Sequence, residues 1–507
     1  MFGLGDRNGL GYYVRDPRSA NRLFSTLGHI LIFGLAFLGS HMVVQRMGLD
    51  TFVVLLVLAF VGSIYALLSF RNMSIPLAVW LLSIGGFRFL FMVPMAGLPD
   101  LYLDRLAMIW LTIIFMIKFF AESRKLRGPF ILDALIILHG TYILTHILIL
   151  DSEHFNLWTK SYLTPYAAYF LGKNIVVDFK RLRLVFLLLL LLAIYYNLTS
   201  IAEKFDLNFL LWPKYMRVDH EIFRGRSNGP FRHAPLFGTI IGMLIPLHLY
   251  FITAARNYLV KFLLYLSLGL SFGGLYFTYT RGSWLVGITA LSVAVALNRR
   301  HYLRLVAPLV VLAPILAVSV LGIGQDQFLK ERVENENTLD ARAGTILTAL
   351  RVWRDHPFTG CGFFQYPQVR LDYVEALEVP ILGTLSFRDF RHNAIHDIYF
   401  GPLAEEGLIG VSLQLIIYFL IFRTFRRKFS WRNKGDPFAT YVMPVFAGIF
   451  VGYLVGGIAI DYRFFSVTGT LFFMTAGILY GYEGETPVEG PLGGLERKSI
   501  NHSTEAV

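Results

Sequence analysis

Apolar stretches of similar length recur along this chain and are separated by short polar breaks. A helix needs about 20 mainly apolar residues to cross the hydrocarbon core of a bilayer. Backbone groups in hydrocarbon must bond within their own segment, so each stretch is predicted to form a helix. The pattern therefore predicts an all-α, polytopic integral membrane protein with about 14 transmembrane helices. The predicted spans are residues 23–44, 51–70, 74–97, 101–121, 129–150, 159–177, 183–204, 229–253, 258–279, 282–297, 305–325, 398–422, 437–460 and 464–482.

The composition supports a membrane protein. Of the 507 residues, 55% are hydrophobic and 16% are charged, whereas soluble domains carry about 25% charged residues. The mean hydropathy is +0.56. The single cysteine, Cys361, excludes an intrachain disulfide. The first span is too long for a signal-peptide core and lacks a small-residue cleavage pattern, so we expect it to remain in the membrane.

The basic residues predict the orientation. If the N-terminus lies inside, every second loop is rich in Lys and Arg, while loops such as DSEHFN at 151–156 contain neither. Cytoplasmic loops carry such an excess, so both termini are predicted to be cytoplasmic. The net charge of +12 follows from this bias and from anionic inner-leaflet lipid, and it does not indicate nucleic-acid binding. The basic groups lie at residues 7–22, 124–127, 180–183, 256–261, 299–304 and 423–434.

Two predicted external segments are long, at roughly 205–228 and 326–397. In the second, apolar residues recur at helical spacing, which predicts a helix along the membrane face. We expect this helix to stop at DHP, because proline disfavours helix in the residue before it. Long loops between membrane helices often carry function. The apolar positions are Ala343, Ile346, Leu350 and Trp353.

Arg226 and Arg281 fall at outer ends of predicted spans or in outer loops. A guanidinium stays charged, and its flat fork matches pairs of phosphate oxygens. Two such groups facing one cavity would hold a diphosphate. Arginines at helix ends also commonly extend to the lipid headgroups without further function. In TYTRGSW, Gly282 and Ser283 leave room for a ligand beside Arg281.

Two histidines occur in RHNAIHDIYFGPLAEEGLIG at 391–410. His392 and His396 are four residues apart and would share one face of a helix. This is also zinc-ligand spacing, but Asn393 stands where a metalloprotease needs Glu, and no clustered third ligand is evident. We therefore expect no metal. Histidine suits the role of a general base, although a histidine at a membrane–water edge is usually only an amphipathic side chain.

Three blocks, in this order, resemble the O-antigen ligase and Wzy polymerase superfamily. The first, RSNGPFRHAPLFG at 226–238, is similar to an arginine, glycine, phenylalanine and proline pattern that opens a span. The second, TYTRGSWL at 278–285, is similar to the family's TxSRGxW-like block. The third, RAGTILTALRVWRDHPFTGCGFFQYP at 342–367, leads into the histidine block and AEEGLIG at 404–410. The resemblance covers about residues 226–410, and the seven N-terminal spans match only in being apolar helices.

The family's histidine motif fits this sequence in two registers. In family members a His-Asn pair precedes an EGLxG-like end, with the histidine eleven residues before the glycine. Counting back from Gly407 gives His396, which is followed by Asp397. The letters His-Asn themselves occur at His392 and Asn393. We favour His396 as the general base.

The resemblance implies transfer of a glycan from an undecaprenyl-diphosphate donor to an acceptor hydroxyl at the outer face of the bacterial plasma membrane. Arg226 and Arg281 would bind the diphosphate and stabilise its charge as it leaves. His396 would take the proton from the acceptor hydroxyl, and attack from the opposite face would invert the product. The family is expected to use neither a metal nor another cofactor in this step.

Four further residues are candidates for substrate binding. Arg342 would contact the acceptor or anchor the external helix. His392 is the alternative base, and Tyr399 would line the sugar path or serve as an interface aromatic. Glu405 would face away from His396 if one helix carries both, so helix packing or capping is an equal alternative.

The acceptor stays open at this stage. It would be lipid A core for a ligase, a growing lipid-linked glycan for a polymerase, or a protein side chain for an O-oligosaccharyltransferase. A chain-length regulator is a candidate partner of a polymerase, and membrane lipids surround the chain in every case. The rival class is a transporter, because ionisable residues inside spans often line a substrate path. The absence of visible symmetry between halves and the large external loop favour the enzyme. These intramembrane residues are Arg88, Asp133, His139 and His146.

The expected organisation follows. A cytoplasmic tail at 1–22 precedes an N-terminal transmembrane bundle at 23–228, which ends in a short external segment. The catalytic membrane region is expected at 229–482, with the external loop 326–397 between the eleventh and twelfth spans. Residues 483–507 would form a second cytoplasmic tail.

Overall fold

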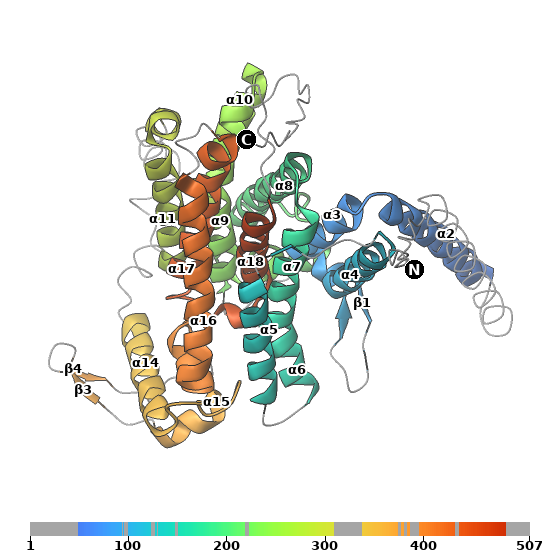
Figure 1. Ribbon diagram of the computed structural model, residues 1–507. Helices are drawn as coiled ribbons and strands as arrows, with labels where there is room; N and C mark the ends of the chain where they lie inside the picture. Colours follow the sequence, from blue (N-terminus) through green and yellow to red (C-terminus); the bar gives the residue numbers. More distant parts are fainter. Residues whose placement is uncertain are drawn as a thin grey trace, which may run out of the picture. The chain divides into compact units, whose positions relative to one another are not determined.

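The computed structural model describes most of the chain after residue 48 (Figure 1). The chain divides into two compact units, Met1–Leu77 with Ile109–Lys125, and Ala78–Met108 with Leu126–Val507. All the candidate site residues lie in the second unit. The described residues are 49–93, 95, 100–122, 127–128, 130–147, 151–217, 223–308, 337–373, 377–379, 383–385, 395–430 and 436–482.

The described part is almost entirely helical, which confirms the predicted all-α class. The strands described form two short antiparallel pairs, β1 (Met92–Val93) with β2 (Leu101–Tyr102), and β3 (Leu377–Val379) with β4 (Gly383–Leu385). The α-helices are α2 (Leu49–Arg71), α3 (Ser74–Leu82), α4 (Leu103–Ala121), α5 (Phe130–Thr145), α6 (Ser152–Trp158), α7 (Thr164–Ile175), α8 (Phe179–Lys204), α9 (Ala234–Ala254), α10 (Tyr258–Tyr276), α11 (Arg281–Leu297), α14 (Asn337–Asp355), α15 (Tyr366–Val369), α16 (Phe400–Phe429), α17 (Met443–Gly456) and α18 (Ser466–Gly481).

Five helical segments among the described residues are long and apolar enough to cross a membrane. They are α8, α9, α10, α16 and the stretch Phe438–Gly456 that contains α17. The bent pair Ala59–Arg71 and Ser74–Leu90 would add a sixth, and α5, α11 and α18 are shorter apolar helices. A multi-pass membrane protein is therefore supported, but the count of about 14 spans is not confirmed. The predicted span 23–44 lies outside the described residues, as does most of 305–325.

The predicted helix over residues 74–97 is wrong in its second half. Helix α3 ends at Leu82 and is followed by a π-helical turn, Ser83–Phe87, in which Gly86 has a φ of 140°. A short 3₁₀ turn, Arg88–Leu90, then leads into β1. The apolar composition concealed this break, because hydropathy does not register the backbone preference of glycine.

In the second unit, α9 lies at the centre of the helical packing. Some 89% of its apolar window is buried. It packs against α8, α10, α11 and α17, and α11 also packs along α17. Helix α7 runs along α18 (Figure 1). An all-apolar helix of this kind has no solvent face to keep polar, which explains why α9 shows little amphipathic pattern.

The helix ends follow ordinary capping chemistry. Asp178 accepts the Arg181 amide at 2.8 Å at the start of α8, and Asn257 accepts the Leu259 amide at 2.8 Å at the start of α10. At the C-terminal end of α18, the Arg127 side chain donates to the Gly481 carbonyl and the Lys428 side chain donates to the Tyr482 carbonyl, each at 2.6 Å. Cations suit this position because the last carbonyls of a helix carry partial negative charge.

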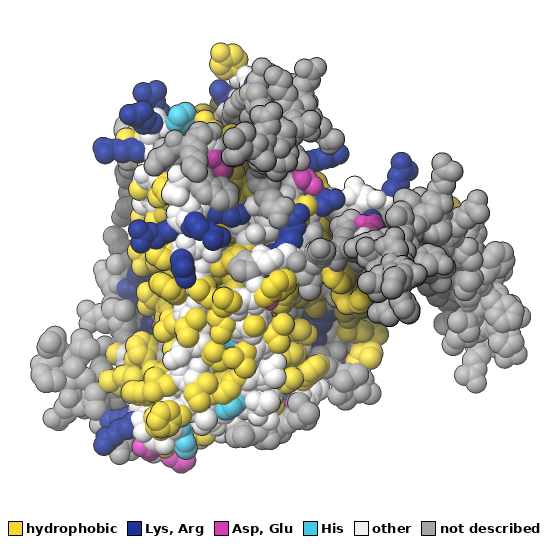
Figure 2. Space-filling view, viewed as in Figure 1, with side chains coloured by type: hydrophobic (Ala, Val, Ile, Leu, Met, Phe, Trp, Pro, Cys, Tyr) yellow, Lys and Arg dark blue, Asp and Glu magenta, His cyan; other side chains and the backbone are white. Residues whose placement is uncertain are grey.

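The surface supports a membrane-embedded unit. Figure 2 shows hydrophobic side chains covering a broad band of the visible face, with many Lys and Arg side chains on one side of that band. The exposed apolar residues include Phe419 and Phe422 of α16 and Leu266 of α10. A soluble surface rarely exposes so much contiguous apolar area, whereas lipid contact requires it.

The orientation can be tested with single cysteines in a Cys361→Ser background. Glu153 of α6 and Ser430, directly after α16, are both exposed, and their segments are predicted to face opposite sides. We expect Glu153→Cys to react with a membrane-impermeant thiol reagent in intact spheroplasts, and Ser430→Cys to react only after lysis. Labelling of Ser430→Cys in intact cells together with protection of Glu153→Cys would reverse the orientation.

Candidate active site

The first two arginine blocks pack directly against each other. The Arg226 Nε donates to the Thr278 carbonyl at 2.9 Å, and an Nη donates to the Thr280 hydroxyl. The Ser227 amide donates to the Phe277 carbonyl at 2.9 Å. Arg226 therefore binds the turn that immediately precedes Arg281. The blocks at 226–238 and 278–285, about 50 residues apart in sequence, form one structural feature.

Arg281 is placed by the sharp connection between α10 and α11. Helix α10 ends at Tyr276, Tyr279 has a φ of 45°, and Arg281 begins α11 with its side chain exposed. The Ser283 hydroxyl fixes the first turn of α11 by donating to the Pro235 carbonyl at 2.8 Å. The free amides at a helix start carry partial positive charge, so Arg281 stands where an anion is already favoured.

Two residues at the end of α8 form hydrogen bonds with both blocks. The partly buried Glu203 carboxylate accepts the backbone amides of Asn228 at 2.7 Å and of Gly229 at 2.9 Å. Its neighbour Lys204 donates to the Tyr279 hydroxyl at 2.9 Å. Two bonds from amides to a carboxylate are stronger than neutral ones, so Glu203 fixes the loop that carries Arg226. The sequence analysis missed this residue, because its partners lie about 25 positions away.

The external helix α14 brings a third arginine to the same place. An Nη of Arg342 lies 3.4 Å from the Ala459 carbonyl. A Cβ on Gly282 would lie only 2.7 Å from the Ala459 side chain, so Arg281 and Arg342 flank the same turn. Burial and the neighbouring charge of Arg281 lower the pKa of Arg342, while Asp397 acts in the opposite sense. Arg342, Arg281 and Asp397 therefore share one electrostatic environment.

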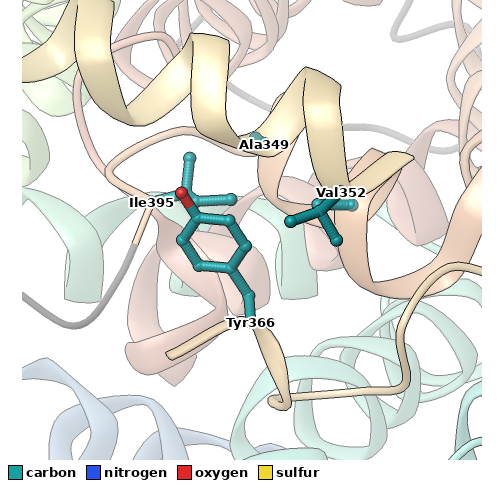
Figure 3. Packing of buried hydrophobic residues seen from close by; sticks show 5 residues of the cluster. Ala349, Val352, Tyr366 and Ile395 are labelled. Atoms are coloured by element: carbon teal, nitrogen blue, oxygen red, sulfur yellow. The ribbon is translucent and has the colours of Figure 1, made fainter. Parts of the chain in front are cut away.

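The segment that carries His396 is held against α14 by a small apolar cluster. Figure 3 shows Ala349 and Val352 of α14, Tyr366 of α15 and Ile395 packed together. Ile395 is 3% exposed, whereas the next residue, His396, is exposed. A buried anchor beside an exposed imidazole fixes the backbone of the histidine while leaving its ring accessible.

Asp397 fixes the start of α16. Its Oδ1 accepts the amides of Tyr399 at 2.5 Å and of Phe400 at 2.7 Å, and burial raises its pKa. The Ile398 amide donates to the Gly457 carbonyl at 2.9 Å, in the turn between α17 and α18. These bonds hold the backbone between His396 and α16 in place.

This geometry corrects the expected placement of the histidines. Helix α16 begins at Phe400, so His396 precedes the helix and does not share a helical face with His392. His392 itself lies outside the described residues. The Tyr399 hydroxyl donates to the Leu454 carbonyl at 2.8 Å, so it is engaged in packing α16 against α17.

Glu405 lies in a buried ion cluster. It is 4% exposed, and its Oε2 lies 2.5 Å from an Nη of Arg463. Arg463 also pairs with Asp461 at 2.8 Å and lies 3.5 Å from Glu406. This supports the packing alternative for Glu405 over direct contact with substrate. Arg463 was missed by the sequence analysis, although Asp461 and Arg463 are an oppositely charged pair between two apolar spans.

The segments PFTGCG and EEGLIG are joined at a break in α16. Helix α16 breaks at Gly407, which has a φ of 67°. The freed carbonyls of Ala404 and Glu405 accept the amides of Cys361 and Gly362 at 2.9 and 3.0 Å. Gly360 has a φ of 69°, and a Cβ there would overlap the Glu405 backbone. The external segment thus closes directly onto the break in α16, and both glycines are required for this contact.

Three of the four ionisable residues predicted inside spans, Asp133, His139 and His146, contact polar groups of neighbouring residues. Lys173 binds both carboxylate oxygens of Asp133, at 2.7 and 2.8 Å. His139 lies 2.5 Å from the Tyr166 hydroxyl, and His146 Nδ1 lies 2.8 Å from the Tyr142 carbonyl. These contacts lie within the helix packing, which weakens the case for a transport path through them.

A cavity of about 30 Å³ lies beside the Arg463 cluster, lined partly by His139, Tyr162 and Ile398. One water needs roughly 10–15 Å³ by this measure, so the cavity accommodates about two waters and no sugar. The described residues form no group of three or more His, Cys, Asp or Glu side chains that could hold a metal ion.

Residues 266–415 match the family model described as O-Antigen ligase, which identifies this stretch as a domain of the O-antigen ligase and Wzy-type superfamily. The match confirms the resemblance and includes Arg281, Arg342 and His396; Arg226 and Arg463 lie outside it. The match and the apolar helices together support a multi-pass membrane protein that carries an O-antigen ligase-like domain. No curated protein matches the chain.

The role of Glu203 can be tested by substitution. Glu203→Ala leaves two partly buried amides without this acceptor, which costs about 1–3 kcal/mol. We expect a lower melting temperature in detergent and strongly reduced glycan transfer in a complemented deletion strain. Glu203→Gln retains one acceptor oxygen and should recover part of both, while Glu153→Gln, at an exposed site, should match the wild type. Wild-type stability and activity in Glu203→Ala would show that this carboxylate does not hold the Arg226 loop.

Proposed function

We propose that this protein transfers a glycan from an undecaprenyl-diphosphate-linked donor to an acceptor hydroxyl at the outer face of the plasma membrane. The observation that supports this most strongly is the grouping of arginines. Arg226 binds the turn before Arg281, and the charge of Arg281 acts on Arg342. The segment with His396 and Asp397 adjoins them.

The donor would be held by its diphosphate. Like charges brought together in a partly buried place repel, and this repulsion is relieved when an anion lies between them. A diphosphate supplies several oxygens for the paired N–H groups of guanidinium. The start of α11 adds backbone amides on the same side. The arginines would bind most strongly when charge builds up on the leaving diphosphate, which is where catalysis requires stabilisation.

The acceptor hydroxyl would be activated by His396. As its oxygen bonds to the anomeric carbon, the hydroxyl proton passes to the imidazole. The bond between the anomeric carbon and the diphosphate oxygen breaks, and its electron pair leaves with the lipid diphosphate. Attack opposite the leaving group inverts the anomeric centre. A hydroxyl of lipid A core or of a growing lipid-linked glycan satisfies the same geometry.

The need for a forked cation can be tested at Arg281. Arg281→Lys keeps the charge but loses the paired N–H groups, so we expect loss of most glycan transfer with normal expression and membrane insertion. Arg354→Lys, at an exposed position of α14, is the matched control and should retain activity. If Arg281→Lys were fully active, a simple charge at the headgroup level would explain the residue.

The identity of the base can be tested with two alanine variants. A general base contributes about 10²–10⁴-fold, so His396→Ala should abolish detectable product in a complemented deletion strain while donor binding persists. His392→Ala should retain substantial activity. An inactive His392→Ala with a normal His396→Ala would assign the base to the other register. If both variants were active, the histidine mechanism would be lost.

A further inference from the structure

Three basic side chains gather beyond the end of α3, outside the arginine group of the candidate active site. Arg88 follows the π-helical turn, Arg105 lies in the first turn of α4, and Lys160 lies in the helical turn between α6 and α7. The guanidinium carbons of Arg88 and Arg105 lie 4.3 and 5.8 Å from the centre of the Tyr102 ring. The charges of both arginines act on Lys160. We call these three residues the Arg88 cluster.

The hydrogen bonds within the cluster are unequal. Arg105 is 5% exposed and donates to the Asp100 carbonyl at 2.7 Å and to the Asn156 side chain. The buried Nε of Arg88 makes no hydrogen bond with any described residue and lies 3.7 Å from the Asp104 carboxylate. Arg105 is thus held in place by the protein, while Arg88 is held by its ion pair with Asp104 and its place over Tyr102, and its side chain remains 18% exposed to a ligand.

Charges of both signs surround Lys160. Burial and the charges of Arg88 and Arg105 lower the pKa of Lys160, while Asp104 and Glu153 act in the opposite sense. An anion placed between Arg88 and Lys160 would relieve the repulsion between these two cations.

An apolar surface adjoins this charge. Phe89, Leu90, Phe91 and Met92 follow Arg88 directly and are 46%, 47%, 51% and 51% exposed. A soluble anion would leave this apolar surface exposed to water. A lipid would cover it, because the phosphate of a lipid lies beside its hydrocarbon chains. The combination of a basic group and exposed apolar side chains is thus complementary to a phosphate-bearing lipid.

Hydrogen bonds place the cluster at the same end of the second unit as the candidate active site. The Tyr215 hydroxyl lies within hydrogen-bonding distance of the carbonyls of Gly86 and Pro230, at 2.7 and 3.1 Å. Pro230 belongs to the block of Arg226. The Ser161 hydroxyl, beside Lys160, donates to the Arg463 carbonyl at 2.5 Å. The cluster therefore serves the same leaflet as the arginine group.

We propose that the Arg88 cluster is a binding site for the phosphate group of a bilayer lipid, whose chains lie against Phe89, Leu90, Phe91 and Met92. The site does not depend on the glycan-transfer proposal, because it uses different residues. Arg88 and Lys160 contact the phosphate, and Arg105 supports it through its fixed position over Tyr102.

The site can be tested by lipid crosslinking to the full-length protein. A photoreactive amino acid replaces Met92, and the protein is reconstituted in vesicles with equal amounts of phosphatidylglycerol and phosphatidylcholine. Mass spectrometry then gives the ratio of the two lipids crosslinked. The same probe at Leu266, an exposed position on α10, reports the surrounding bilayer. We expect clear enrichment of phosphatidylglycerol at position 92 and none at position 266.

Substitutions distinguish a specific lipid-binding site from general electrostatic attraction of anionic lipid to the protein. Because one basic residue near the surface contributes roughly a fivefold preference for anionic lipid, Arg88→Gln and Lys160→Gln should each lower the enrichment by about that factor. Lys160→Arg and the control Arg354→Gln should leave it unchanged. An equal ratio at positions 92 and 266 would mean ordinary lipid contact and would overturn the proposal. Loss of the enrichment in excess inorganic phosphate would assign the cluster to a soluble anion and overturn the lipid assignment.

Discussion

The buried side chain of Arg463 is the interaction on which the candidate site depends. Its guanidinium pairs with Glu405 of α16 and with Asp461 of its own turn, between α17 and α18. Removing one partner of a buried pair leaves an uncompensated charge and costs about 3–5 kcal/mol. The cluster therefore fixes α16 and the 457–463 turn relative to each other.

Each part of the site is attached to that turn. The Gly457 carbonyl accepts the amide of Ile398, two residues after His396. The Ala459 carbonyl lies 3.4 Å from Arg342, and Ala459 itself limits the space beside Gly282. Residues from three distant parts of the sequence thus take their positions from one short connection. Such fixed placement is what a charged site needs, because donors that are already oriented need little reorganisation when charge develops.

The sequence predicted well those features that depend on local composition. The apolar stretches 258–279 and 282–297 correspond closely to α10 and α11, and the external helix ends at Asp355 before His356 and Pro357, as the proline predicted. Arg226 and Arg281 were selected from motif and chemistry, and the structure brings their blocks together. Their roles in catalysis remain proposals.

The other features could not be predicted from the sequence, because they depend on pairs of residues that are far apart in the chain. Glu203 and Arg463 have ordinary local contexts, and their importance arises from partners that are 25 and 58 residues away. His396 does not lie on a helix as expected, because α16 begins only at Phe400. Span 74–97 failed at Gly86, where one backbone angle ends the helix despite an apolar sequence. Hydrophobic pattern alone carries none of this information.

The most direct measurement is an experimental structure of the protein with a lipid-diphosphate glycan donor bound. The proposed mechanism predicts diphosphate oxygens within about 3 Å of guanidinium nitrogens of Arg226, Arg281 and Arg342. It also predicts the His396 ring on the opposite side of the anomeric carbon. A diphosphate bound away from these three arginines, for example at the Arg88 cluster, would contradict the account.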